Sequence, residues 1–156
     1  MPRIATTTFV PVDVATAFAV SQMHGPERVE WDPFIHSQHL IDADAPAKGV
    51  QTATVSRHRL KMVTEYVSFR APTQVGMKMV EGPWFFSTFG SGWAFKEIDG
   101  GTEATWRYTF AVQPKWLSPI ADPIGRWLLG RDIRARIGAF AAACENPAVI
   151  AALPSA

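Results

Sequence analysis

The fold is decided by residues 92–106, GWAFKEIDGGTEATW. Asp99-Gly100-Gly101, in the middle of this stretch, predicts a hairpin turn, because glycine readily adopts the positive φ that tight turns require. On both sides of the turn, large apolar residues alternate with small or polar ones, as in strands with one buried face. The stretch therefore predicts two long antiparallel strands, over residues 85–98 and 101–112.

The rest of the chain supplies further strands and one long helix. Strand patterns cover residues 4–10, 35–42, 51–58, 61–70 and 73–80, and helical patterns cover residues 12–22, 26–30 and about 117–152. Short connections between successive strands imply an antiparallel sheet, and a long helix packed on that sheet gives a two-layer α+β domain over residues 1–156. Gly90 and Gly92 lie in mid-strand, where glycine predicts a sharp bend, so we expect the sheet to curl.

Composition excludes several classes of protein. The chain has 156 residues, of which 47% are hydrophobic and 19% charged, which predicts one folded domain rather than disorder. The formal net charge of +1 argues against nucleic-acid binding. With Cys144 alone, no intrachain disulfide forms. We expect a cytoplasmic protein, because no signal peptide and no membrane span are visible.

Strand periodicity predicts an apolar cavity between the sheet and the long helix. We expect the inward-facing residues to contact a hydrophobic ligand. The predicted contacts on the strands are Val67, Phe69, Val75, Met77, Met79, Phe89, Trp93, Phe95, Trp106, Tyr108 and Phe110, and those on the helix are Ile124, Trp127 and Leu128.

The long helix carries two apolar stripes that point in nearly opposite directions. The first includes Ile120, Ile124, Trp127 and Leu128, and the second consists of Ile133, Ile137, Phe140 and Cys144. Either the helix kinks near Gly130, or its first half packs on something other than the sheet. We expect the second half to grip the sheet and the first half, with Trp116, to cover a cavity mouth or meet a second subunit in a homodimer.

Two residues are candidates for catalysis. Glu65 shares strand parity with Val63, Val67 and Phe69, so its carboxyl group would be buried and could act as a general base, although its neighbour Tyr66 could face inward instead. Tyr108 lies on the inward face of its strand and could orient a carbonyl group, or simply pack in the core.

The remaining charged residues suggest no chemistry. His36 and His39 point to opposite faces of a strand, so we expect no metal site and no cofactor. We expect His24 and His58 to be exposed. Arg126, Arg131, Arg134 and Arg136 are interpreted as a solvated helix face.

The quoted motifs resemble those of the START-like (SRPBCC) superfamily, in its polyketide cyclase/dehydrase and lipid-transport branch. That branch commonly has a Trp-x-Phe pattern followed by Gly-Thr and an aromatic residue on its last two strands, here Gly92–Phe95 and Gly101–Trp106. The opening Val12–Phe18 and the turn Trp31-Asp32-Pro33 also match. The resemblance implies a helix-grip (Bet v 1-like) fold of about seven strands around a long C-terminal helix. It carries over no catalytic residue, because the superfamily has no universal one.

Three functions follow from the resemblance. The first is binding or transport of a lipid, polyketide or other aromatic compound in the apolar cavity. The second is a polyketide cyclase or dehydratase that uses Glu65 or Tyr108. The third is a protein-interaction module similar to the Hsp90-activator relatives of this fold, which would use its surface rather than its cavity.

Overall fold

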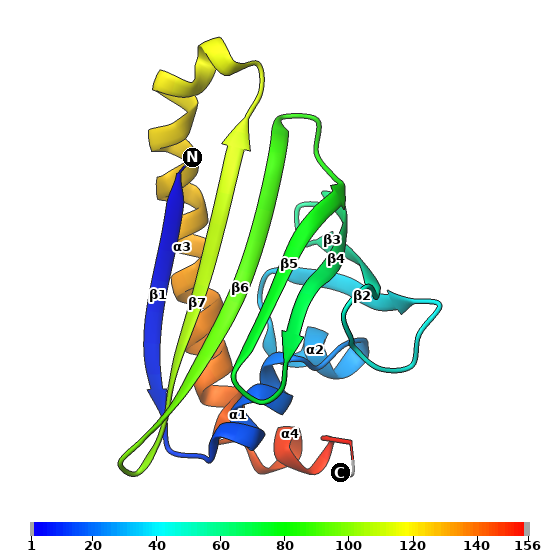
Figure 1. Cartoon of the computed structure of the whole chain (residues 1–156), viewed down its shortest axis with the longest axis vertical. Coiled ribbons are helices and arrows are strands. Elements are labelled where there is room, and N and C mark those ends of the chain that lie inside the picture. The colour runs from blue at the N-terminus through cyan, green and yellow to red at the C-terminus, as the bar shows by residue number, and fades with distance from the viewer. Residues whose placement is uncertain (1, 155–156) are drawn as a thin grey trace.

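The computed structural model describes residues 2–154 and consists of one curled sheet and a set of helices (Figure 1). The strands are β1 (Arg3–Val10), β2 (Ile35–Ile41), β3 (Gln51–Ser56), β4 (Lys61–Arg70), β5 (Gln74–Glu81), β6 (Phe86–Ile98) and β7 (Gly101–Val112). The helices are α1 (Val14–Ser21), α2 (Pro26–Trp31), the single 3-10 turn η1 (Lys115–Leu117), α3 (Ser118–Cys144) and α4 (Pro147–Ala151). The predicted fold class, an α+β helix-grip domain, is confirmed.

The seven strands form one antiparallel sheet in the order β1-β7-β6-β5-β4-β3-β2. Each strand from β2 to β7 pairs with the next one along the chain. The first strand, β1, pairs with the last strand, β7, and forms one edge of the sheet. Figure 1 shows α3 running along β1 and β7. The short helices α1 and α2 lie in the lower part of this view, towards the C-terminal end of α3. The sheet and α3 are therefore the two walls between which a cavity can form.

The predicted hairpin between β6 and β7 is present. Gly100 has φ +82°, a left-handed conformation that favours glycine. A Cβ on Gly101 would lie 2.2 Å from the backbone oxygen of Val10, so a larger residue would push β1 away from the turn. These two glycines allow β1 to pack tightly against the end of the hairpin.

The predicted C-terminal helix over residues 117–152 is wrong in its limits. The helix α3 ends at Cys144, and α4 starts after Asn146, whose side chain accepts a hydrogen bond from the backbone N–H of Ala148 at 3.0 Å. Asp122-Pro123, a residue pair that is typical of a helix start, lies inside α3. The helix is continuous through Gly130, so its two apolar stripes face different surroundings.

The core lies between the second half of α3 and the β6–β7 hairpin. Trp93 and Trp106 stack across the two strands with ring centroids 4.2 Å apart. The ring of Phe140 on α3 packs on Trp93 at 4.7 Å. Ile133, Ile137 and the other members of this stripe are likewise buried. The second half of α3 therefore grips the sheet, as expected.

A β-bulge in β4 changes which of its side chains face inward. Tyr66 pairs with Met77 and Ser68 with Gly76, so two steps along β4 correspond to one step along β5. The extra residue, Val67, is 41% exposed. Strict alternation therefore fails across Val67, and Tyr66 and Phe69 both face the interior, with ring centroids 5.5 Å apart.

Candidate ligand-binding cavity

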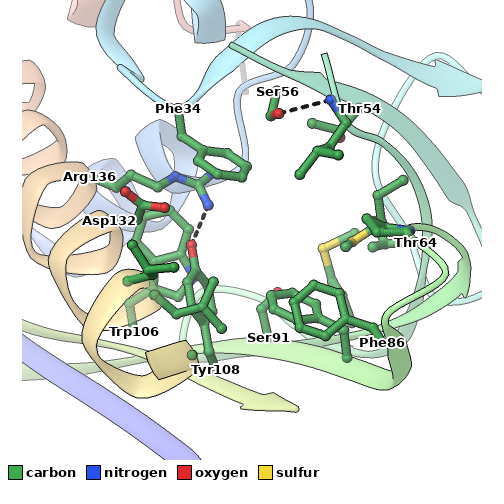
Figure 2. A pocket seen from close by; sticks show the side chains of 18 of the residues that line it. Phe34, Thr54, Ser56, Thr64, Phe86, Ser91, Trp106, Tyr108, Asp132 and Arg136 are labelled. Carbon is green, nitrogen blue, oxygen red and sulfur yellow. Dashed lines mark hydrogen bonds between the residues drawn. The ribbon is translucent and has the colours of Figure 1, made fainter. Parts of the chain in front are cut away.

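A cavity of about 930 Å³ lies between the curled sheet and α3. Figure 2 shows side chains from several strands and from α3 arranged around an open centre, with Phe34 and Thr54 on one side and Tyr108, Ser91 and Phe86 on the other. The walls are mostly apolar and aromatic. Strongly exposed side chains mark the mouth, among them Trp84 in the β5–β6 loop (74% exposed) and Ile120 on α3 (68% exposed).

The structure places the predicted ligand contacts in two groups. Those that line the cavity are Val75, Met77, Phe89, Trp93, Trp106, Tyr108, Ile124 and Leu128. Those that lie off its wall are Val67, Phe69, Met79, Phe95, Phe110 and Trp127.

Most of the side chains off the wall have another environment. Phe69 and Phe95 pack on Phe18 in the core, with ring centroids 5.4 and 5.7 Å away. Phe110 is fully buried, and a Cβ on Gly125 would lie 2.8 Å from its ring, so β7 and α3 approach closely there. Trp127 is 62% exposed on the outer side of α3.

The first half of α3 only partly meets its prediction. Ile120, Ile124 and Leu128 line the mouth of the cavity, as expected, whereas Trp116 and Trp127 do not. Trp116 is 77% exposed. A homodimer through this exposed face stays a prediction.

Tyr66, rather than Glu65, faces the cavity, because of the bulge at Val67. Tyr66 is 1% exposed and lines the wall. Glu65 is half-buried on the other face of the sheet, where it accepts a hydrogen bond from the side-chain N–H of Gln51 at 3.3 Å. Of the two alternatives that the sequence left open, the structure therefore favours the inward-facing Tyr66.

A buried cluster of charged residues forms part of the cavity wall. Arg28 and Asp32 lie four residues apart at the end of α2, with Arg28 Nε 2.9 Å from Asp32 Oδ2. Arg136, on α3, meets the same carboxylate with Nη2 at 2.8 Å and Nε at 3.0 Å. All three are less than 9% exposed, and both arginines line the cavity. We call Arg28, Asp32 and Arg136 the arginine cluster.

The arginine cluster corrects the interpretation of the helix arginines as a solvated face. Arg126, Arg131 and Arg134 are exposed, but Arg136 is 8% exposed. The sequence did contain a signal, since Arg136 falls on the buried stripe beside Ile133 and Ile137. An arginine in an apolar stripe indicates a buried partner, although the sequence does not show that this partner is Asp32.

Electrostatics favour the charged forms of Asp32 and Arg136 within the arginine cluster. Burial alone would raise the pKa of the Asp32 carboxyl, but the charges of Arg136 and Arg28 lower it to about 2. For Arg136, burial acts to lower the pKa, yet Tyr108 and Asp32 bring it above its ordinary value. The pKa of Arg28 is lowered, chiefly by burial, although Asp32 opposes the shift.

Tyr108 joins the arginine cluster to the cavity. Its hydroxyl oxygen accepts a hydrogen bond from Arg136 Nη1, and the guanidinium group of Arg136 lies 4.2 Å from the Trp106 ring centroid (Figure 2). Burial raises the pKa of the Tyr108 hydroxyl, with Arg136 acting against the shift. At neutral pH this group is therefore a hydrogen-bond donor to the cavity and not a base.

A second polar group surrounds Tyr66. Its hydroxyl donates to Gln22 Oε1 at 2.7 Å and lies 3.2 Å from His24 Nε2. Burial and the nearby Arg28 lower the pKa of His24 to about 4, so its ring is neutral at pH 7. The expectation that His24 is exposed is wrong, because the loop between α1 and α2 folds it against Tyr66.

Within residues 2–154, no three His, Cys, Asp or Glu side chains come together in a way that could hold a metal ion. The buried thiol of Cys144 has its pKa raised to about 12 by burial, and it lies off the cavity wall. In the same part of the chain, no helix is long and apolar enough to cross a membrane.

The curled sheet, the covering helix and the enclosed cavity together define a START-like helix-grip domain. A family model confirms this assignment: the chain belongs to the polyketide cyclase / dehydrase and lipid transport family, whose model matches residues 1–145. No curated protein matches the sequence.

Solved structures with the same fold share little sequence with this chain. A START superfamily protein from Mycobacterium smegmatis is 13% identical with a TM-score of 0.77, over 92% of this chain and 97% of that one. TTHA0849 from Thermus thermophilus is 10% identical with a TM-score of 0.75, over 97% of this chain and 98% of that one. The di-domain ARO/CYC BexL from the BE-7585A biosynthetic pathway is 16% identical with a TM-score of 0.72, over 93% of this chain and 50% of that one. At these identities the likeness concerns the fold alone.

Proposed function

We propose that the protein binds a hydrophobic small molecule, such as a lipid or an aromatic polyketide, non-covalently in the cavity. The observation that carries the proposal is a cavity of about 930 Å³ with mostly apolar walls. Clefts of about 300–1,000 Å³ with apolar walls and a few polar groups are typical small-molecule sites. The rings of Trp93 and Trp106 line this space and form part of its apolar wall.

The energetics favour an occupied cavity. At about 24 cal/mol per Å³, a dry apolar void of this size would cost more than ~20 kcal/mol, which exceeds the ~5–15 kcal/mol stability of a typical domain. Water or a ligand must therefore fill the space. An apolar ligand would release water from apolar walls, and that release is favourable.

The family description and the related structures support the same proposal. The description names both polyketide cyclisation and lipid transport, which share a hydrophobic substrate or cargo. A cyclase or dehydratase is the second candidate, and Tyr108 with Arg136 favours it, since two donors at the wall could stabilise an enolate oxygen. Glu65 has no part in that candidate, because it lies off the wall. The open cavity argues against a module that works through its surface alone.

Binding can be tested with a neutral apolar probe. The protein is stripped of co-purifying molecules with organic solvent, refolded and titrated with the methyl ester of pyrenebutanoic acid, while energy transfer from tryptophan to pyrene is measured. We expect saturable binding of one probe per chain. Mass spectrometry of the solvent extract would identify any natural ligand.

A pair of serines on β6 provides matched variants for this test. Ser91 lines the cavity, whereas Ser87 is exposed and its hydroxyl donates to the backbone oxygen of Ala111 at 3.2 Å. Ser91→Phe should abolish probe binding because its ring enters the cavity, and Ser87→Phe should leave binding unchanged. Equal binding by both variants would place the probe outside the cavity and contradict the proposal.

A further inference from the structure

The arginine cluster carries more positive than negative charge. Arg28 and Arg136 contribute two cations, and Asp32 contributes one anion. Among residues 2–154, these two ion pairs are the only ones within 4.0 Å, and both use the same carboxylate. Arg28 also donates a hydrogen bond from Nη1 to the backbone oxygen of Ser21, which ties α2 to α1. A single arginine would be enough to neutralise Asp32, so the second leaves one positive charge without a counter-charge.

The excess charge faces the cavity. Arg28 and Arg136 line it, whereas Asp32 lies behind them, fully buried and off the wall. Two further charged residues line the cavity, Asp132 and Arg131, and their charges cancel. The wall is therefore positively charged where it meets the arginine cluster.

Hydrogen-bond donors remain available at the same place. The hydroxyl of Tyr108 accepts a bond from Arg136, and within the described part of the chain it donates none, so its proton is free for a ligand. Arg136 directs Nε and Nη2 to Asp32 and Nη1 to Tyr108, which leaves one N–H on each terminal nitrogen. Tyr66 and His24 nearby are neutral at pH 7 and supply no competing anion.

We propose that the natural ligand carries a carboxylate, and that this group is bound at the arginine cluster by Arg136 and Tyr108 while the apolar part of the ligand fills the cavity. This inference rests on the proposed function. A buried charge without a partner is unfavourable, and a carboxylate would neutralise the excess cation. Hydrogen bonds between a guanidinium group and a carboxylate are among the strongest available to a protein.

A pair of probes that differ only in charge tests the proposal. Pyrenebutanoic acid and its methyl ester have the same ring system and chain, but only the acid is ionised at pH 7. The wild-type protein should bind the acid about tenfold or more tightly than the ester, in line with the strength of hydrogen bonds to charged groups. Equal affinity for acid and ester would overturn the proposal.

Arg28→Met is the decisive variant, because it removes the excess charge and leaves Asp32 paired with Arg136. We expect this variant to lose most of the preference for the acid over the ester, measured as the ratio of the two affinities. Arg134→Met, which removes an exposed arginine from α3, is the matched control and should keep the preference. Retention of the full preference by Arg28→Met would contradict the proposal.

Tyr108→Phe keeps the ring and removes the hydroxyl, so it should lower the ratio of acid affinity to ester affinity several-fold. If Arg28→Met does not fold, the acid-to-ester ratio in the wild type and in Tyr108→Phe still decides the question. Failure of the wild type to bind either probe would overturn the proposed function itself. Binding of the ester with no preference for the acid would overturn only the inference that the natural ligand carries a carboxylate.

Discussion

Asp32 is the residue on which the buried charges depend. Its carboxylate is fully buried and accepts hydrogen bonds from both Arg28 and Arg136. Because the two arginines hold its pKa at about 2, Asp32 stays ionised throughout the physiological range. The stability that this shift provides is present above pH ~4 and is lost as the pH falls through 2.

Asp32→Asn should therefore destabilise the protein strongly. Removing the carboxylate leaves two buried arginines without a counter-charge, and breaking a buried ion pair in this way costs about 3–5 kcal/mol. Urea unfolding at pH 7 measures the change in the free energy of unfolding. Asp44→Asn, at an exposed loop position, is the control and should change it by less than about 0.5 kcal/mol. A loss below about 1 kcal/mol in Asp32→Asn would contradict this account.

His24 should make the stability depend on pH between about 4 and 6.5. Its pKa is about 4 in the folded protein and has the ordinary value of 6.5 in the unfolded chain, so over this range the unfolded chain takes up a proton that the folded protein does not. Stability is therefore complete above pH 6.5 and decreases as the pH falls, by up to about 3 kcal/mol at pH 4.

The variant His24→Gln removes this titration and keeps a polar group near Tyr66. Unfolding in urea at pH 7 and pH 4.5 should show a loss of stability about 2 kcal/mol smaller in the variant than in the wild type. Exposed His39→Gln should follow the wild type. Identical pH profiles for wild type and His24→Gln would refute a buried neutral imidazole.

The limits of β7 and β4 are both predicted correctly, but only β7 has the side-chain orientations that strict alternation predicts. In β7 the residues Ala104, Trp106, Tyr108 and Phe110 alternate with polar ones, and all four are buried as expected. In β4 the bulge at Val67 interrupts the alternation, and a bulge leaves no mark in a period-two pattern. The inward-facing Tyr66 is therefore not predictable from periodicity alone.

The helix α3 shows what an amphipathic pattern can and cannot predict. Its two stripes correctly indicate that the two halves have different surroundings. The pattern does not reveal that Arg136 pairs with Asp32, because the two residues are 104 positions apart and meet only when α2 and α3 pack. Pairings between distant elements depend on the tertiary structure, and helical periodicity does not report them.

The two halves of α3 should respond differently to truncation of their apolar side chains. Phe140 is fully buried against Trp93, so Phe140→Ala should lower the free energy of unfolding by about 3–5 kcal/mol. Ile120 is 68% exposed at the cavity mouth, so Ile120→Ala should change the free energy of unfolding by less than about 0.5 kcal/mol. Comparable losses in urea unfolding would mean that both halves pack on the body of the protein.

At the scale of the whole molecule, the cavity results from the way α3 crosses the sheet. The helix α3 packs on β1 and β7, and Ile120, Ile124 and Leu128 in its first half line the cavity mouth. The strand pattern predicts an apolar interior but not its volume, because the volume depends on how far the helix lies from the curled sheet. The side chains that line the cavity lack packing partners on the side that would contact a ligand.

Filling that space should stabilise the ligand-free protein. The ring introduced by Ser91→Phe would bury apolar surface among Phe89, Tyr108 and Met77 and displace water, for a gain of about 1–2 kcal/mol in the free energy of unfolding. Ser87→Phe adds the same ring to an exposed position of β6 and should change stability by no more than about 0.5 kcal/mol. Urea unfolding of both variants after removal of bound molecules provides the comparison. If Ser91→Phe is more stable than the wild type and no longer binds the probe, the open cavity lowers the stability of the wild-type protein. If Ser91→Phe is less stable than the wild type, the wall at Ser91 has no room for a ring, which contradicts this prediction.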